Sequence, residues 1–209
     1  MQGCRMGDIH NTSLWGIAGT NFMKNLLVED CMLSRIDVHM GVSGYYIIRR
    51  STLVHMGVNA IGRGQLVVED STVHSQRMIK FRSDYGSTWD GEVLIRNSRW
   101  VPPQSDSDTV AMFGVQNDGT HDFGYNSSMP TTIRIEGLTI DDGPARAGTS
   151  NVVLFDDPSG ALDPTLPHPY RPTKYVEITN LTTTSRLTPR VSENPDVAKI
   201  IPVSGLGEN

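Results

Sequence analysis

The chain has 209 residues, which is enough for a single buried core, and a mild formal net charge of −5 at pH 7. This charge, and the lack of a basic run with interleaved aromatic residues, argue against a nucleic-acid partner. No stretch of about 18 apolar residues is present, so we expect no membrane span, and residues 1–8 lack the regions of a signal peptide.

One six-residue pattern recurs along the chain, beginning at residues 26, 46, 66, 93, 133 and 176. Its first and third positions are apolar, and the third is always Val or Ile. Alternate residues of a strand face the same way and β-branched residues suit a packed sheet, so each copy predicts a strand with its odd positions inward. The first three copies begin 20 residues apart, and such a repeat is typical of a solenoid.

The fourth position of the pattern faces outward and alternates in charge. Its first five members are Glu29, Arg49, Glu69, Arg96 and Glu136. If the strands stack in parallel about 4.8 Å apart, each charge lies between opposite charges. An exposed pair contributes only roughly 0–1 kcal/mol, but a slip by one coil would bring like charges together, so the alternation favours one register. The fifth position holds mainly Asp, Asn or Gly, which predicts a turn at the end of each strand.

This periodicity, with a turn residue in each unit, resembles the right-handed parallel β-helix proteins, which include pectate-lyase-like enzymes and the tailspikes and appendages of bacteriophages. The resemblance covers about residues 5–181 and is more specific for fold than for activity. It implies an all-β, right-handed parallel β-helix solenoid of about six to seven coils over residues 1–181. Long insertions are expected at 101–131 and 141–174, and an extended tail at 182–209.

The resemblance also has implications for the setting of the chain. It suggests an extracellular or virion-associated protein and a homo-oligomer, such as a trimer. A parallel β-helix has an open strand edge at each end, and open edges invite association. The repeat begins almost at the N-terminus, so stacking on another chain, or membership of a longer protein, is expected.

The two cysteines, Cys4 and Cys31, lie little more than one coil apart, a spacing that allows a disulfide between them. Cys31 occupies a position that Ser51, Ser71 and Ser98 fill in later coils. This series of small residues favours a buried free thiol.

The candidate functional residues lie mostly in a polar stripe after the repeated strands. Its members are Arg35, Asp37, His39, His55, Asn59, Lys80, Arg82 and Asp84. Stacking by the twenty-residue repeat predicts that Asp37 lies opposite Gly57 and that His39 lies opposite Asn59. The stripe is then expected to face outward across three coils.

Two chemistries fit the stripe. A polysaccharide lyase needs a base, for which Lys80, Arg82 and His39 are candidates, and a cation such as Arg35 or Arg82 to neutralise the substrate carboxylate. A glycoside hydrolase instead needs two carboxyl groups roughly 5–9 Å apart, for which Asp37, Asp84 and Asp90 are candidates. Lyases of this fold class often use Ca²⁺, but no recognisable calcium loop is present, so no metal or other cofactor is predicted.

The segment from Asp84 to Gly91 lengthens its coil and carries Tyr85 and Trp89. Exposed rings flanked by Asp90 would make a sugar-binding platform, and the alternative is that both rings cover the core. With His55, Asn59 and Arg35, these residues form the predicted substrate-binding set. Trp100 aligns with buried strand positions and is expected in the core.

We therefore expect a tailspike-like module that binds, and could also degrade, a host-surface polysaccharide. A non-catalytic structural or receptor-binding β-helix is the first alternative, and a secreted polysaccharide lyase is the second. The sequence leaves catalysis open.

Overall fold

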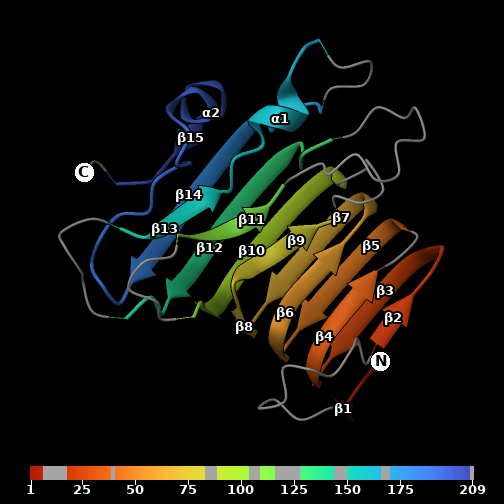
Figure 1. The fold of residues 1–209 in the computed structure, drawn as a ribbon. Helices are drawn as coiled ribbons and strands as arrows, with labels where there is room; N and C mark the ends of the chain where they lie inside the picture. The colour runs from red at the N-terminus through yellow and green to blue at the C-terminus, as the bar shows by residue number, and fades with distance from the viewer. Residues whose placement is uncertain are drawn as a thin grey trace.

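The computed structural model describes residues 1–6, 18–38, 41–82, 89–103, 109–115, 128–143, 150–165 and 170–207. Within these residues the chain is mostly β, and fifteen strands belong to one sheet. The pairings between these strands are parallel. Figure 1 shows the strands side by side, from β1 and β2 at one end to β14 and β15 at the other.

The strands form two stacks. The first stack contains the repeated segments: β3 (Met23–Glu29), β5 (Val42–Arg49), β7 (Gly62–Glu69), β10 (Trp89–Val101), β12 (Thr132–Ile140), β14 (Tyr175–Thr183) and the short β15 (Val203–Ser204). The second stack follows the turns: β1 (Arg5–Met6), β2 (Ala18–Thr20), β4 (Met32–Val38), β6 (Thr52–Ala60), β8 (Thr72–Ser75), β9 (Arg77–Phe81), β11 (Val110–Gly114) and β13 (Val152–Phe155). β10, β12 and β14 continue through the turn and pair on both sides of it.

The first stack has the register that the repeat predicts. The six β-branched third positions pair in sequence and are all buried: Val28, Ile48, Val68, Ile95, Ile135 and Ile178. The alternating charges also lie in register. Arg49 Nε is 2.6 Å from Glu29 Oε1, and Arg96 Nη2 is 2.9 Å from Glu136 Oε2. The predicted pairing of the charged column is therefore confirmed.

Each repeated segment has a left-handed backbone conformation at its fifth position. The fifth positions have positive φ in all six copies: Asp30 (54°), Arg50 (47°), Asp70 (49°), Asn97 (45°), Gly137 (84°) and Asn180 (60°). Asn, Asp and Gly adopt this region most readily. The predicted turn at this position is confirmed, and it separates the first stack from the second.

The residue after each turn forms a ladder of buried hydroxyl groups. Ser51 Oγ accepts from the N–H of Cys31 at 3.1 Å, and Ser71 Oγ accepts from the N–H of Ser51 at 3.1 Å. Ser98 Oγ accepts from the N–H of Ser71 at 3.2 Å. Both cysteines are free and Cys31 is buried, so the free-thiol interpretation is confirmed.

The second stack departs from the twenty-residue repeat. Leu33 pairs with Leu53, but Arg35 pairs with Gly57, so β6 contains two more residues than β4 between these pairs. The extra residues form a bulge in which His55 and Gly57 have positive φ, 67° and 63°. The prediction that Asp37 lies opposite Gly57 is therefore wrong, because the bulge shifts the register by two residues.

Two short helices complete the described structure: α1 (Ser159–Leu162) and α2 (Pro195–Ile200). Asn194 caps α2 by accepting from the N–H of Asp196, and α2 buries Val197 beside Ile201. β15 follows α2 and pairs with Val176 and Glu177 of β14. The domain boundary expected after residue 181 stays a prediction. Among the described residues, no helix is long and apolar enough to cross a membrane.

Candidate functional site

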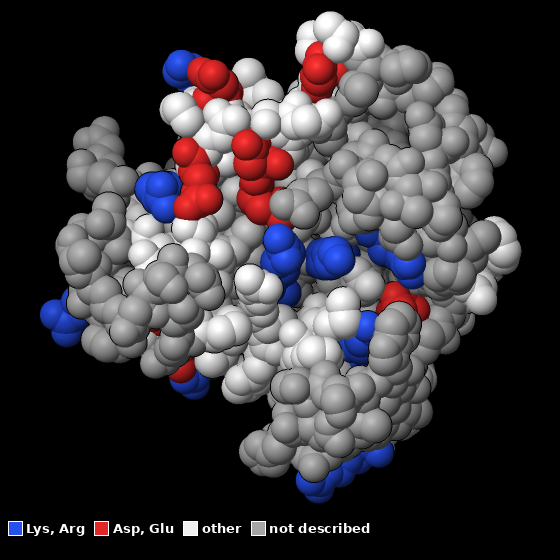
Figure 2. Space-filling model, in the orientation of Figure 1, with Lys and Arg blue, Asp and Glu red and all other residues white. Residues whose placement is uncertain are grey.

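A row of four residues lies in register on the outward face of the second stack, three of them polar and the fourth Gly114. Asp37 of β4 pairs with Asn59 of β6, and Asn59 pairs with Lys80 of β9. Lys80 in turn pairs with Gly114 of β11. At about 4.8 Å per strand, the row extends roughly 14 Å along the stack. Figure 2 shows Lys and Arg side chains gathered near the middle of the view, where Figure 1 places β9 and β11.

Asp37 is the centre of a network that we call the Asp37 cluster, formed by Arg35, Asp37, Asn59 and Arg82. Arg35 Nη2 is 2.8 Å from Asp37 Oδ2, and Asn59 donates from Nδ2 to Oδ1 at 3.0 Å. Arg82 Nη1 lies 3.5 Å from the same Oδ1. Because both oxygens already accept from protein donors, the carboxylate is arranged to hold cations and is poorly arranged to transfer a proton to a ligand.

The bulge in β6 builds this cluster. It brings Asn59 opposite Asp37, and it places Met56 so that its sulfur accepts a hydrogen bond from Arg35 Nη1. The Arg35 side chain is only 5% exposed. A charge buried to this degree needs a close counterion, so the position of Arg35 depends on Asp37.

Arg77 and Lys80 extend the cationic surface beyond Asn59; we call them the cationic pair. Arg77 Nε is 2.9 Å from Asp156 Oδ2, and Asp156 Oδ1 also accepts from the N–H of Val115 at 2.8 Å. Gly114 lies beneath both cations. A Cβ at this position would lie 2.5 Å from Arg77 Cδ and 3.4 Å from Lys80 Cγ. The absent side chain leaves room for the two long stems.

A cavity of about 810 Å³ adjoins the Asp37 cluster on the same stack; we call it the His74 cavity. Its walls are mostly apolar, and its lining residues are Thr52, Val54, His55, Met56, His74, Ser75, Gln76, Val101, Pro102 and Pro103. Met56 belongs to both features, because it lines the cavity and contacts Arg35. The face therefore combines a concave apolar wall with a fixed array of polar and charged side chains, which is typical of a ligand site.

The titration of His74 reflects its surroundings. Partial burial lowers the pKa of His74 below its ordinary value of 6.5, and the nearby Arg99 lowers it further. Asp141 acts in the opposite direction on His74. A hydrogen bond from Arg99 holds the pKa of Asp141 below its ordinary value of 3.8. His74 is therefore a neutral hydrogen-bonding group in the cavity at pH 7.

The structure brings together five of the predicted site residues: Arg35, Asp37, Asn59, Lys80 and Arg82. His55 lies on the bulge and lines the adjoining cavity. The predictions for His39, Asp84 and Tyr85 fall outside the described residues.

Two other predicted residues do not belong to this face. Trp89 is fully buried, with its ring 6.4 Å from that of Tyr46 and its Nε1 donating to the carbonyl of Glu92. The exposed platform predicted for Trp89 is wrong, and the alternative of a core residue is confirmed, as is burial of Trp100. Asp90 pairs with Arg171 at 3.3 Å and lies on β10, three repeats away from Asp37. At about 4.8 Å per strand, these two carboxylates are too far apart for a hydrolase pair.

Several residues of the face were not anticipated from the sequence. Met56 was missed because the bulge was not recognised, although Gly57 two residues after His55 is a signal for an irregular strand. Asp156 was missed because it lies 79 residues from its partner Arg77, inside a segment treated as an insertion. Within the described residues, no group of three or more His, Cys, Asp or Glu side chains could hold a metal ion.

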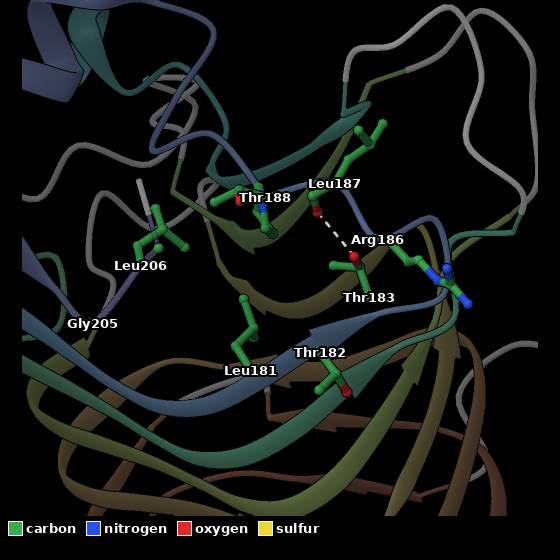
Figure 3. Close-up of a pocket in the computed structure, with 10 residues that line it drawn as sticks. Leu181, Thr182, Thr183, Arg186, Leu187, Thr188, Gly205 and Leu206 are labelled. Atoms are coloured by element: carbon green, nitrogen blue, oxygen red, sulfur yellow. Dashed lines mark hydrogen bonds between the residues drawn. The ribbon is translucent and has the colours of Figure 1, made fainter. Parts of the chain in front are cut away.

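A second pocket, of about 320 Å³, lies between the second half of β14 and the chain that follows it. Figure 3 shows Leu181 and Leu206 on its walls, a hydrogen bond from Thr183 to the carbonyl of Leu187, and Arg186 directed away from these leucines. Its lining is mainly apolar or hydroxyl-bearing. It is less suited to recognising a charged ligand than the face around Asp37.

Comparison with known proteins gives one informative relationship. No protein-family model matches the chain, and no solved structure matches it. The chain is 30% identical over 94 residues to a protein described as a capsule KL64-specific depolymerase of Klebsiella phage P510. The match covers 40% of this chain and 9% of that protein, so it is distant and partial.

Proposed function

We propose that this chain is a polysaccharide-binding module with a right-handed parallel β-helix fold, belonging to a tailspike-like phage protein that recognises host-surface glycans. The in-register parallel stacks and the repeated left-handed turns support the fold. The partial similarity to a phage capsule depolymerase supports the ligand class and a virion-associated setting. In such a setting the module acts as part of a larger, oligomeric assembly.

The observation that carries the proposal is the joining of the His74 cavity to the Asp37 cluster through Met56. A polysaccharide is long and rich in hydroxyl groups, and it needs an extended surface with polar or charged groups along its length. The row from Asp37 to Gly114 repeats along the stack at about 4.8 Å per strand, close to the length of one sugar residue. The adjoining cavity supplies apolar area against which a ring face or an acyl group packs.

Binding is supported more strongly than cleavage. Asp37 is held by Arg35, Asn59 and Arg82, which makes it a positioning group. Asp90 is too distant to act with it as the second carboxyl group. A segment that binds the glycan, while a different part of the assembly cleaves it, is the arrangement that we propose.

The test is a binding measurement on a panel of Klebsiella capsular polysaccharides that includes KL64, with Val101→Trp as the site variant. Val101 is half-buried and lines the His74 cavity, so the larger ring fills it. Leu94→Trp is the matched control, because Leu94 is also half-buried on β10 but faces outward from the first stack.

We expect wild type and Leu94→Trp to bind the same polysaccharide, and Val101→Trp to bind about tenfold more weakly, equivalent to about 1.4 kcal/mol. Equal binding by all three would place the site elsewhere. Binding of no polysaccharide would refute the proposed function and favour a purely structural module. Release of reducing or unsaturated ends in the same samples would show that the chain also cleaves.

A further inference from the structure

We propose that the glycan bound on this face is acidic, and that the cationic pair, Arg77 and Lys80, holds one of its carboxylates. This inference rests on the proposed function and names the class of substrate for the same site. It depends on which positive charges already have a counterion within the protein.

The described part of the face has more positive than negative side chains. Four cations lie along it, Arg35, Arg77, Lys80 and Arg82, and two carboxylates pair with them, Asp37 and Asp156. Asp37 lies between Arg35 and Arg82, and Asp156 binds Arg77. Arg35 and Arg82 take part in further interactions within the protein, so the positive charge that remains for a ligand is at Lys80 and at the terminal nitrogens of Arg77. This charge lies on the same stack as the concave His74 cavity, and a concave surface concentrates the field on an approaching anion.

Lys80 is the clearest part of that remaining positive charge. Its side chain is partly buried, and within the described residues no carboxylate lies within ion-pair distance of it. Its neighbour Asn59 is 6% exposed, and the buried Oδ1 of Asn59 has no hydrogen-bond partner among the described residues. A partly desolvated ammonium group gains more from an incoming anion than an exposed one does, because water screens the interaction less.

Arg77 supplies the geometry that a carboxylate requires. It binds Asp156 through Nε, and the terminal nitrogens Nη1 and Nη2 donate to no other group among the described residues. The terminal nitrogens of a guanidinium group offer parallel donors to a ligand oxygen pair. Asp156 is itself fixed by the N–H of Val115, so the guanidinium is oriented before a ligand arrives.

Gly114 leaves room for the side-chain stems of both cations over the backbone. A Cβ at residue 114 would lie 2.5 Å from Arg77 Cδ, which is too short for an unstrained contact. Arg77 presents the paired N–H donors of its guanidinium group, and Lys80 presents a single ammonium charge on the same surface. An anionic sugar, with a planar carboxylate carried on a ring, is the ligand that matches both.

The experiment compares uronate-containing Klebsiella capsular polysaccharides in two forms. Each polymer is used native and after its carboxylates have been reduced to primary alcohols, and a neutral capsular polysaccharide is included. Lys80→Gln removes the charge, whereas Lys80→Arg keeps it. Lys199→Gln is the matched control, because Lys199 is an exposed lysine on α2 that pairs with Asp196.

We expect the native acidic polymer to bind wild type at least tenfold more tightly than its reduced form. Lys80→Gln should remove most of that difference, and Lys80→Arg and Lys199→Gln should retain it. Arg77→Lys, which keeps the charge and loses the paired N–H donors, should weaken binding of the native form and leave that of the reduced form unchanged.

The inference is overturned if native and reduced polymers bind equally, or if Lys80→Gln weakens both to the same extent. Binding of the neutral polysaccharide alone would also overturn it, while leaving the proposed function intact. If the chain binds none of these polymers, both the inference and the proposed function fail.

Discussion

Substitution of Asp37 by Asn is the most informative perturbation of the polar face. The side chains of Arg35 and Asp37 are 5% and 19% exposed, and their charged atoms are 2.8 Å apart. An asparagine side chain at this position would have the same shape but no charge, so it would remove the carboxylate charge that lies 2.8 Å from the buried Arg35 guanidinium. Removing one partner of a buried ion pair costs about 3–5 kcal/mol. We expect a value near the lower limit, about 3 kcal/mol, because Asp37 is not fully buried and Asn retains one acceptor oxygen.

The assay is equilibrium unfolding in urea. The difference in the free energy of unfolding is calculated from the urea concentrations at the midpoints, with the same dependence on urea concentration for every variant. Asp90→Asn is the matched control, since Asp90 and Arg171 form a pair at 3.3 Å with side chains 55% and 58% exposed. Such a pair contributes about 0–1 kcal/mol. The double variant Arg35→Met/Asp37→Asn removes the buried cation as well, and should therefore be more stable than Asp37→Asn alone. Equal stabilities for Asp37→Asn and Asp90→Asn would refute the burial argument for Arg35.

Three further predictions concern other parts of the molecule. Gly64→Ala should lower the free energy of unfolding by about 3 kcal/mol or more, because the φ of Gly64 is +107° and the new Cβ would lie 2.0 Å from the carbonyl oxygen of Gly44. Gly160→Ala is the control in the same unfolding assay and should be nearly neutral, because no atom lies within 4 Å of its Cβ. Ser71→Ala should cost about 1–3 kcal/mol by leaving the buried N–H of Ser51 without an acceptor, and an unchanged unfolding midpoint would contradict the role of the hydroxyl ladder. His74 should titrate below 6.5 in an NMR pH series, and Arg99→Ala should raise its pKa, whereas Arg134→Ala on the first stack should not. Because the folded-state pKa of His74 is lowered, its contribution to stability is present above pH 6.5 and is lost as the pH falls through the folded-state value.

The repeated strand was predictable because its signals are local and periodic. The β-branched third position, the charge alternation from Glu29 to Glu136 and the turn residue from Asp30 to Asn180 each depend on neighbours one repeat away. A single register satisfies all three columns, and a slip by one residue would turn the apolar side chains outward. The apolar, charged and turn positions each require the same register, so the sequence alone was enough to predict how the repeated strands pair.

The polar face was only partly predictable, because its register depends on the bulge at His55 and Gly57. The sequence correctly grouped Arg35, Asp37 and Arg82, yet assigned Asp37 the wrong partner. Asp156 reaches Arg77 across 79 residues of chain, and no periodic signal connects them. Trp89 was predicted wrongly for a different reason. An aromatic residue next to Asp90 suggests an exposed sugar-binding platform, and only the three-dimensional packing shows that Trp89 is buried against Tyr46.

The measurement that tests the proposed function most directly is a crystal structure of the chain with an oligosaccharide from the best-binding capsular polysaccharide. We expect sugar residues along the row from Asp37 to Gly114, with one in the His74 cavity against Met56 and Val101. An oligosaccharide bound instead to the first stack, or in the pocket beside Leu181 and Leu206, would contradict the assignment of this face as the binding site.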